Sequence, residues 1–461
     1  MSDPFASGLA TAAAIRAGEV SAVEVARAAL DRIAAEDGRL NSFTTVTAER
    51  ALAEAAAVDA ARARGATLPP LAGVPYAVKN LFDLAGVVTV AGSKIEREKP
   101  PAAADAFLVG QMRAAGAVCV GALNMDEYAY GFTTENAHDG NCHNPHDLAR
   151  SAGGSSGGCG AAVAGGLVPI SLGSDTNGSI RVPSSLCGIF GLKPSYGRLA
   201  RTRTYPFVAS LDHLGPFARD VADLAAAWDA LQGRDLEDPA QGDWPVEPAM
   251  PVLGEAIDGV RIATADDYFA RNGQPEAFAG VAAVAEALGV RRRVTVPEAA
   301  RARAAAFLIT ASEGANLHLP DLRTRAQDFD PGTRDRLLAG ALIPGTWVIQ
   351  AQRLRAWFRA RMLALFEEVD VILAPATPYV APKLGQQTIE VDGEVLPVRP
   401  MLGVFTQPIS FIGLPVLAVP VPLPGGLPIG VQLIGRPGSE NVLFRVAAAL
   451  ERAGAVRAPR P

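Results

Sequence analysis

Three residues of this chain, Lys79, Ser155 and Ser179, have the types and the settings that acyl transfer requires. They lie in the segments Val-Pro-Tyr-Ala-Val-Lys79, Gly-Gly-Ser155-Ser156-Gly-Gly and Asp175-Thr-Asn-Gly-Ser179. A serine hydroxyl becomes a good nucleophile when a neighbouring base removes its proton, and lysine is that base in serine–lysine enzymes. The three segments therefore predict a base, a proton-relaying hydroxyl and a nucleophile, without a histidine or a metal.

Ser179 follows consecutive residues whose backbone N–H groups could converge on one point. Such convergence stabilises the negative oxygen of a tetrahedral intermediate. A lone Gly-Ser pair is usually a turn without chemistry, but a second glycine-serine segment precedes this one at Ser155. The pair of segments favours catalysis.

Lys79 follows an apolar, strand-like stretch, and only five of the 42 basic residues are lysines. Burial disfavours the charged form of lysine, so its pKa falls toward the range in which it can accept a proton. The alternative is an ordinary lysine that extends from a strand end into water. The two serine segments favour the interpretation of Lys79 as a catalytic base.

Ser155 also begins a plausible helix, where its hydroxyl would act only as an N-cap. In addition, residues 153–157 match the G-x-S-x-G pattern of an α/β-hydrolase nucleophile. That mechanism needs a downstream histidine, and neither His213 nor His318 has a setting that suggests a triad. The relay role is therefore preferred.

Two other ligand classes are not favoured. His138, His143 and His146 resemble a metal site, but their spacing fits no common zinc pattern and the segment is rich in Asn, Gly and Pro, as in a polar loop. The glycine-rich region around Ser155 contains no P-loop and no dinucleotide-binding pattern. We expect no cofactor and no metal.

Composition points to a small organic substrate. A net charge of −6 argues against a protein that mainly binds nucleic acid or an anionic membrane. The four cysteines form no C-x-x-C pair and are expected to be reduced, in the cytoplasm. We recognise no signal peptide, and the longest apolar run, 157–173, is interrupted by Gly and Pro and is short for a membrane span.

The order of expected elements predicts an α/β fold with a mixed sheet. Ser21 and Glu24 form a capping box that begins a helix through about Arg32, and a second helix covers about 47–64. Short β-like runs then alternate with helices. We expect a single domain over 1–461, with these parts: a helical hairpin over about 1–66, a core segment over 70–220, a helical insertion over 255–370 and a return to the core over 371–455.

The three catalytic segments together resemble the amidase signature family, and the resemblance covers most of the chain. It extends to further stretches: Asn124-Met-Asp-Glu-Tyr128, Cys187-Gly-Ile-Phe-Gly-Leu-Lys193-Pro, Ser210-Leu-Asp-His-Leu-Gly-Pro216 and Gly426-Leu-Pro-Ile-Gly-Val-Gln432-Leu-Ile-Gly435. The resemblance implies one α/β domain in which helices cover both faces of a mixed sheet, and hydrolysis of a carboxamide.

The same resemblance implies a role for each site residue. Ser179 is the nucleophile, Ser155 is a relay held in a cis peptide, and Lys79 is the base. The oxyanion hole is formed by Thr176, Asn177 and Gly178. Supporting residues are Ser156, Asp175 and Arg181, and Tyr128 is a candidate substrate contact. The family more often has Gly at position 177, and Asn keeps the backbone N–H that the hole needs.

Within the family, the resemblance implies hydrolysis of a small urea-like acid of the 1-carboxybiuret type, with release of ammonia. The alternatives are a glutaminase subunit of a tRNA-dependent amidotransferase, another small-amide amidase, and an inactive scaffold. An oligomer that includes a small helical partner subunit is also implied. Direct binding of nucleic acid or membrane is not.

Overall fold

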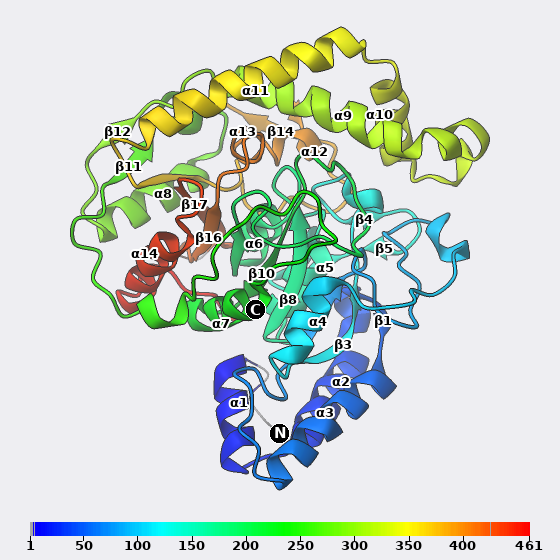
Figure 1. Cartoon of the computed structure of the whole chain (residues 1–461). Helices are drawn as coiled ribbons and strands as arrows, with labels where there is room; N and C mark the ends of the chain where they lie inside the picture. The colour runs from blue at the N-terminus through cyan, green and yellow to red at the C-terminus, as the bar shows by residue number, and fades with distance from the viewer. Residues whose placement is uncertain (1–2, 4, 425) are drawn as a thin grey trace.

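The computed structural model describes residue 3 and residues 5–424 and 426–461. A mixed sheet forms the centre of this part of the chain (Figure 1). Its eleven strands run in the order β1 (Phe43–Val46), β3 (Val118–Leu123), β2 (Pro75–Lys79), β8 (Ile170–Asp175), β10 (His213–Ala218), β9 (Phe190–Lys193), β16 (Val416–Val421), β17 (Ile429–Gly435), β13 (Val371–Pro375), β11 (Ile262–Ala265) and β12 (Arg293–Val294).

The sheet contains both parallel and antiparallel pairs, which confirms the predicted mixed sheet. Strand β2 is parallel to both β3 and β8, whereas β10 is antiparallel to β8 and β9. Every residue of β3, β16 and β17 is buried, and apart from Gln432 in β17 these strands are apolar, as expected when both faces of a sheet are covered. Two-stranded ribbons lie outside the sheet: β4 (Glu135–Asn136) with β5 (Gly140–Asn141), β6 (His143–Asn144) with β7 (Asp147–Ser151), and β14 (Thr388–Val391) with β15 (Glu394–Pro397).

Helices cover both faces of the sheet. On β17, Gly430 lies against Ser185 of α6 and Gly435 lies against Leu443 of α14. Because successive strand residues point to opposite faces, positions 430 and 435 face opposite sides, so α6 and α14 do too. The main helices are α1 (Gly8–Ala17), α2 (Ala22–Leu40), α3 (Ala48–Ala63), α4 (Phe107–Ala114), α5 (Gly157–Ala164), α6 (Arg181–Cys187), α7 (Val221–Leu231), α8 (Pro275–Ala287) and α14 (Glu440–Arg452).

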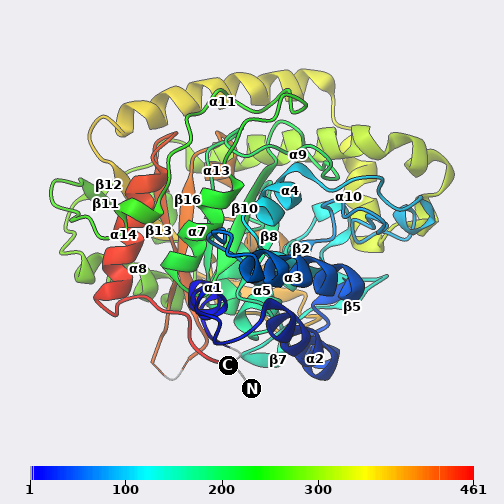
Figure 2. The ribbon, with the colours of Figure 1, turned by 60° about the horizontal axis from the view of Figure 1, so that its bottom comes forward.

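The two expected N-terminal helices are present as α2 and α3, but α1 precedes them and strand β1 lies between them, which the prediction of a hairpin did not include. The capping box of Ser21 and Glu24 is formed, which confirms the predicted start of α2. The helix continues beyond Arg32 to Leu40, because Ile33 and Leu40 extend its buried face. Arg460 donates to Asp3 at 2.9 Å, so these two residues near opposite ends of the chain lie close together (Figure 2).

A layer of helices lies across the top of the sheet in both views (Figures 1 and 2). It contains α9 (Ala299–Thr324), α10 (Pro331–Ala341) and α11 (Gly345–Leu365), and α9 also packs on α13 (Gln407–Ser410), with α12 (Val398–Met401) nearby. This layer falls within the predicted helical insertion. In the residues described, no helix is long and apolar enough to cross a membrane.

Candidate active site

Lys79 and Ser174 stand side by side because their strands are parallel neighbours. The register pairs Val78 of β2 with Leu172 of β8, so the carboxyl ends of the two strands lie at the same edge of the sheet. At that edge the Nζ of Lys79 donates to the Oγ of Ser174 at 3.0 Å and to the Oγ of Ser155 at 2.6 Å. The structure therefore brings together the predicted base and the predicted relay.

Ser155 lies in the turn that begins α5, after a cis peptide bond between Gly154 and Ser155. The backbone N–H of Asp126 donates to the carbonyl of Ser155 at 3.3 Å, and the neighbouring Ser156 donates its hydroxyl to the carbonyl of Ser174 at 3.1 Å. A side chain at position 154 would overlap the carboxylate of Asp126. Glycine at this position allows the turn to reach the strand ends.

Burial changes the acid–base behaviour of Lys79. The side chain has no exposed surface, and removal from water disfavours the ammonium form, which lowers its pKa from 10.5 to about 8. The carboxylates of Asp126 and Asp175 oppose this shift without cancelling it. Lys79 is thus an amine that can be neutral in mildly alkaline solution, as a general base must be.

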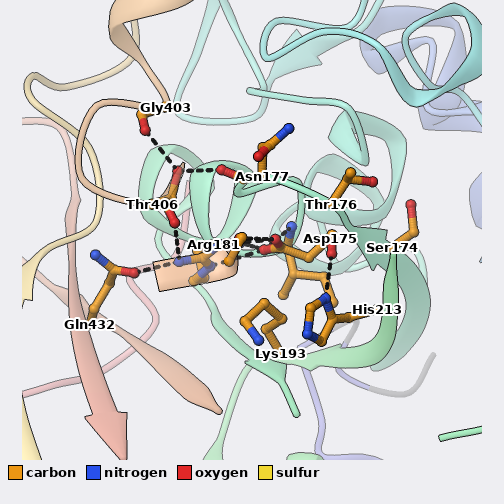
Figure 3. A network of polar contacts seen from close by, with 12 residues as sticks. Ser174, Asp175, Thr176, Asn177, Arg181, Lys193, His213, Gly403, Thr406 and Gln432 are labelled. Atoms are coloured by element: carbon orange, nitrogen blue, oxygen red, sulfur yellow. Dashed lines mark hydrogen bonds and ion pairs between the residues drawn. The ribbon is translucent and has the colours of Figure 1, made fainter. Parts of the chain in front are cut away.

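A buried ion pair holds the segment that contains Ser179. The carboxylate of Asp175 accepts from the Nε and Nη2 of Arg181 at 3.0 and 2.9 Å and from the N–H of Ile180 at 3.1 Å (Figure 3). Arg181 also donates to Gln432 at 2.7 Å. Burial alone would raise the pKa of Asp175, but Arg181 outweighs it and holds that pKa well below its usual range. The pair fixes the two ends of the turn from 175 to 181.

Within this turn, separate contacts hold each of the predicted oxyanion-hole residues in place. Thr176 donates its hydroxyl to Asp212 at 2.6 Å, and Asn177 donates its amide to Thr310 of α9 at 2.8 Å. Thr406 donates to the carbonyl of Asn177 at 2.6 Å. Gly178 has a φ of 142°, and a Cβ there would overlap the side chain of Thr406. Position 178 therefore requires glycine.

Ser179 lines a cleft of about 550 Å³, which we call the serine-side cleft. Thr176 and Asn177 line it beside Ser179, and three arginines form part of its wall: Arg303, Arg336 and Arg399. Arg303 donates to Gln407 at 2.9 Å and Arg399 donates to Glu135 at 2.7 Å. Arg336 lies over the ring of Tyr130, with 4.0 Å from its guanidinium carbon to the ring centre.

Tyr128, the candidate substrate contact, is not among the described residues that line this cleft. Its φ is 52°, and its ring turns into a buried cluster, 3.9 Å from the ring of His318. The hydroxyl accepts from Ser93 at 2.8 Å. The tyrosine that lines the cleft is Tyr130, two positions later.

Sequence reasoning did not identify Ser174 or the three arginines. Ser174 precedes Asp175 directly, so its position at the end of a strand parallel to that of Lys79 was a usable signal. The arginines come from α9, α10 and α12, far from the catalytic segments in the sequence. No local pattern distinguishes them from the other arginines of the chain.

The histidines take other positions. The Nδ1 of His213 lies 3.1 Å from the carbonyl of Asp175, and burial lowers its pKa well below the ordinary value (Figure 3). His146 contacts the carbonyl of Cys187 at 2.9 Å, and His138 lies 3.1 Å from Glu127. In the described part of the chain, no group of His, Cys, Asp and Glu side chains could hold a metal ion.

Comparisons with known proteins agree with this geometry. The amidase family model matches residues 24–444. A 1-carboxybiuret hydrolase subunit from Pseudomonas sp. (strain ADP) is 55% identical over 446 residues, covering 96% of this chain and 97% of the relative. The A subunit of the glutamyl-tRNA(Gln) amidotransferase from Moorella thermoacetica is 39% identical over 470 residues, covering 96% of this chain and 95% of the relative.

Solved structures give the same result. One belongs to a vestigial protein complex that reveals the evolutionary origins of an s-triazine catabolic enzyme, and it matches with a TM-score of 0.97 at 54% identity over 98% of this chain and 100% of that chain. The A subunit of the Thermotoga maritima glutamyl-tRNA(Gln) amidotransferase matches with a TM-score of 0.79 at 28% identity, over 94% and 91% of the two chains. These matches confirm the resemblance that the motifs indicated. The chain is a member of the amidase family and an amide-cleaving hydrolase.

Proposed function

We propose that this chain hydrolyses the terminal carboxamide of a small urea-like acid of the 1-carboxybiuret type, through an acyl group on Ser179. The observation that carries the proposal is the hydrogen bond of 2.6 Å between Lys79 and Ser155, beside a cleft that contains Ser179 and three arginines. In this scheme Ser179 is the nucleophile, Ser155 relays its proton, and Lys79 is the base.

The reaction begins with neutral Lys79. It takes the proton of Ser155, which takes that of Ser179, and the oxygen of Ser179 attacks the amide carbon. The C–N bond then breaks, the relay returns the proton to the nitrogen, and ammonia leaves. Water attacks the acyl carbon with the same groups as base, and the acid product is released.

The oxyanion of both tetrahedral intermediates is assigned to backbone N–H groups at Thr176, Asn177, Gly178 and Ser179. Donors fixed before the reaction stabilise developing charge without reorganisation during it. The Asp175–Arg181 pair and the bond from Thr406 to Asn177 supply that rigidity. Ser156 supports the relay through its bond to the backbone of Ser174.

The arginines favour an acidic substrate. Arg399 is paired with Glu135, whereas Arg303 is held by the amide of Gln407 and the carbonyl of Pro400. Arg336 is held by the carbonyls of Gly332 and Tyr130. Arg303 and Arg336 therefore hydrogen-bond only to neutral groups, and a planar carboxylate is the group that a guanidinium binds best. The name of the relative at 55% identity supports the same substrate class.

We also propose that the chain works in the cytoplasm with a small helical partner subunit. The solved relative at 54% identity belongs to a protein complex, which supports an assembly. The four cysteines are free and buried, as expected in a reducing compartment.

Ammonia release from a panel of amides tests the substrate class. The purified chain, alone and with a small subunit encoded beside its gene where one exists, is supplied with freshly made 1-carboxybiuret, biuret, glutamine and asparagine. The proposal predicts turnover of 1-carboxybiuret, with glutamine inert. Turnover of glutamine alone would contradict it and favour the amidotransferase function that the relatives near 39% identity carry.

A further inference from the structure

Glu127 is a buried acid that the proposed reaction does not use, and it stands two positions before the wall of the serine-side cleft. Only 1% of the residue is exposed. Its Oε2 accepts from the backbone N–H of Asp330 at 2.8 Å, and its Oε1 lies 3.1 Å from the Nε2 of His138. Glu127 and Asp330 are 203 positions apart, so the carboxyl group joins two distant segments of the chain.

The first of these segments forms part of the cleft wall. Glu127 begins the short 3-10 turn η2 (Glu127–Ala129), and residues 129–132 line the serine-side cleft. Tyr128 and Ala129 have φ values of 52° and 60°, a conformation that few residues other than glycine adopt. Such a turn persists where surrounding contacts hold it, and the carboxyl group of Glu127 makes two of these contacts.

The second segment begins the helix that carries Arg336. Asp330 directly precedes α10, and its carboxylate accepts from the N–H of Gly332 at 2.8 Å as the N-cap and from the N–H of Ala137 at 2.8 Å. Gly332 and Arg336 of this helix line the serine-side cleft. The bond from Asp330 to Glu127 therefore fixes where α10 begins relative to η2, and with it the position of Arg336.

Arg336 closes a circuit of contacts. It donates to the carbonyl of Tyr130, and its guanidinium carbon lies 4.0 Å from the centre of the Tyr130 ring. Tyr130 follows η2 directly. The circuit runs from Glu127 along the chain to Tyr130, across to Arg336, and back through α10 and Asp330 to Glu127. It restricts the guanidinium, as binding of a planar carboxylate through two parallel hydrogen bonds requires.

Burial explains how an acid makes both contacts. Removal from water raises the pKa of Glu127 to about 8, although the N–H of Asp330 opposes the shift. At neutral pH the carboxyl group keeps its proton, so one oxygen can donate to His138 while the other accepts from Asp330. Burial lowers the pKa of His138, which favours the neutral ring that such a bond needs. A glutamine can make the same two bonds, whereas a leucine can make neither.

We propose that Glu127 is a positioning residue for substrate binding, which holds Arg336 against Tyr130 by joining η2 to the start of α10. The inference rests on the proposed function, in which arginines of the cleft favour an acidic substrate. Glu127 touches neither the substrate nor the catalytic serines in this role. Its loss therefore affects KM for the acid and not kcat.

Steady-state kinetics with 1-carboxybiuret test this role. Glu127→Leu and Glu127→Ala should each raise KM on the order of tenfold and change kcat by less than about threefold, because a loosely held guanidinium makes a weaker charge-assisted bond. Glu127→Gln should keep the KM of the unmodified chain. Uncharged biuret, tested as a substrate or as a competitive inhibitor, should bind all of these proteins alike. The alanine variant keeps the test open if the leucine variant fails to fold.

Asp229→Leu is the matched control. Asp229 of α7 also joins two segments, since its carboxylate accepts from the backbone N–H groups of Ala249 and Met250. It is not among the described residues that line the serine-side cleft. Its loss should leave both KM and kcat unchanged.

A double-mutant cycle shows whether Glu127 acts through Arg336. In the Arg336→Met background, Glu127→Leu and Glu127→Ala should raise KM no further, because no guanidinium is left to position. An equal rise of KM in both backgrounds would overturn the positioning role. So would an unchanged KM in the leucine and alanine variants, or a rise in Glu127→Gln as large as theirs.

Reaction of Arg336 with phenylglyoxal gives a readout that needs no substrate. Mass spectrometry measures the rate of labelling at Arg336 relative to Arg334 on the same helix. This ratio should rise several-fold in Glu127→Leu and Glu127→Ala and stay unchanged in Glu127→Gln. An unchanged ratio in the first two variants would overturn the positioning role and leave the proposed function intact. A raised ratio in a chain that does not hydrolyse 1-carboxybiuret would support the hold of Glu127 on Arg336 and overturn the proposed function.

Discussion

The Nζ of Lys79 lies 2.6 Å from the Oγ of Ser155, and neither side chain has any exposed surface. A lysine removed from water in this way favours its neutral form, and its nearest acceptors are the hydroxyls of Ser155 and Ser174 rather than a carboxylate. In the proposed mechanism, this pairing of a buried amine with a hydroxyl activates the nucleophilic serine without a histidine.

The first prediction concerns pH. Only neutral Lys79 can accept a proton, and its pKa lies near 8, below the ordinary 10.5. The neutral fraction therefore rises with pH through about 8, and kcat/KM for the amide substrate should rise with it and level off above. A pH profile between 6 and 10 measures this. A rate that is flat across that range, or that falls as pH rises through 8, would argue against Lys79 as the base.

The second prediction concerns the turn before Ser179. Gly178→Ala should lower kcat by about 10²- to 10³-fold, the cost of losing one oxyanion donor, because a Cβ at a φ of 142° forces the turn away from Thr406. Gly254→Ala is the matched control, since nothing lies within 4 Å of a Cβ there. Equal activity in the two variants would show that the turn at 178 plays no part in binding the oxyanion.

A third prediction concerns stability. Arg181→Gln leaves the buried carboxylate of Asp175 without its cation and should lower the free energy of unfolding by about 3–5 kcal/mol. Arg301→Gln breaks an exposed pair with Glu298 and should change it by less than about 0.5 kcal/mol. Urea unfolding followed by circular dichroism compares them. Similar urea concentrations at the midpoint of unfolding for the two variants would contradict the supporting role assigned to Arg181.

The fourth prediction concerns substrate charge. Arg336→Met should raise KM for 1-carboxybiuret about 10- to 100-fold, the loss expected for one charge-assisted hydrogen bond. Arg334→Met, on the same helix and paired with Asp335, serves as the control. Uncharged biuret, assayed as a substrate or as a competitive inhibitor, should bind both variants alike. If biuret binding weakens as much as that of the acid, Arg336 acts on cleft shape and not on charge.

The elements of the fold were predictable from sequence where the decisive contacts are local, and the motifs around Lys79 and Ser155 predicted the contact that the structure shows between them. The Ser21–Glu24 capping box needs residues only three positions apart, and the central strands β16 and β17 are apolar runs interrupted only by Gln432. Strand β10 was missed because Ser210-Leu-Asp-His-Leu-Gly-Pro216 has the composition of a turn, although it pairs with β8 over six positions.

The arginines of the cleft were not predictable, because they come from helices that fold back from far along the chain. Arg303, Arg336 and Arg399 meet only when α9, α10 and α12 have packed over the sheet edge. Tyr128 and Tyr130 are nearly adjacent in sequence, and the φ of 52° at Tyr128 decides which ring lines the cleft. No pattern of apolar and polar residues in the sequence predicts this backbone angle.

The most direct test of the account is the mass of the enzyme during turnover. Rapid acid quenching with 1-carboxybiuret present, followed by digestion and mass spectrometry, should place one acyl group on the peptide that contains Ser179. Ser179→Ala should carry no acyl group and release no ammonia. Ser155→Ala should be equally inactive, and the unmodified enzyme should carry no acyl group on Ser155. Acylation of Ser155, or ammonia release by Ser179→Ala, would contradict the assignment of Ser179 as the nucleophile and Ser155 as its relay.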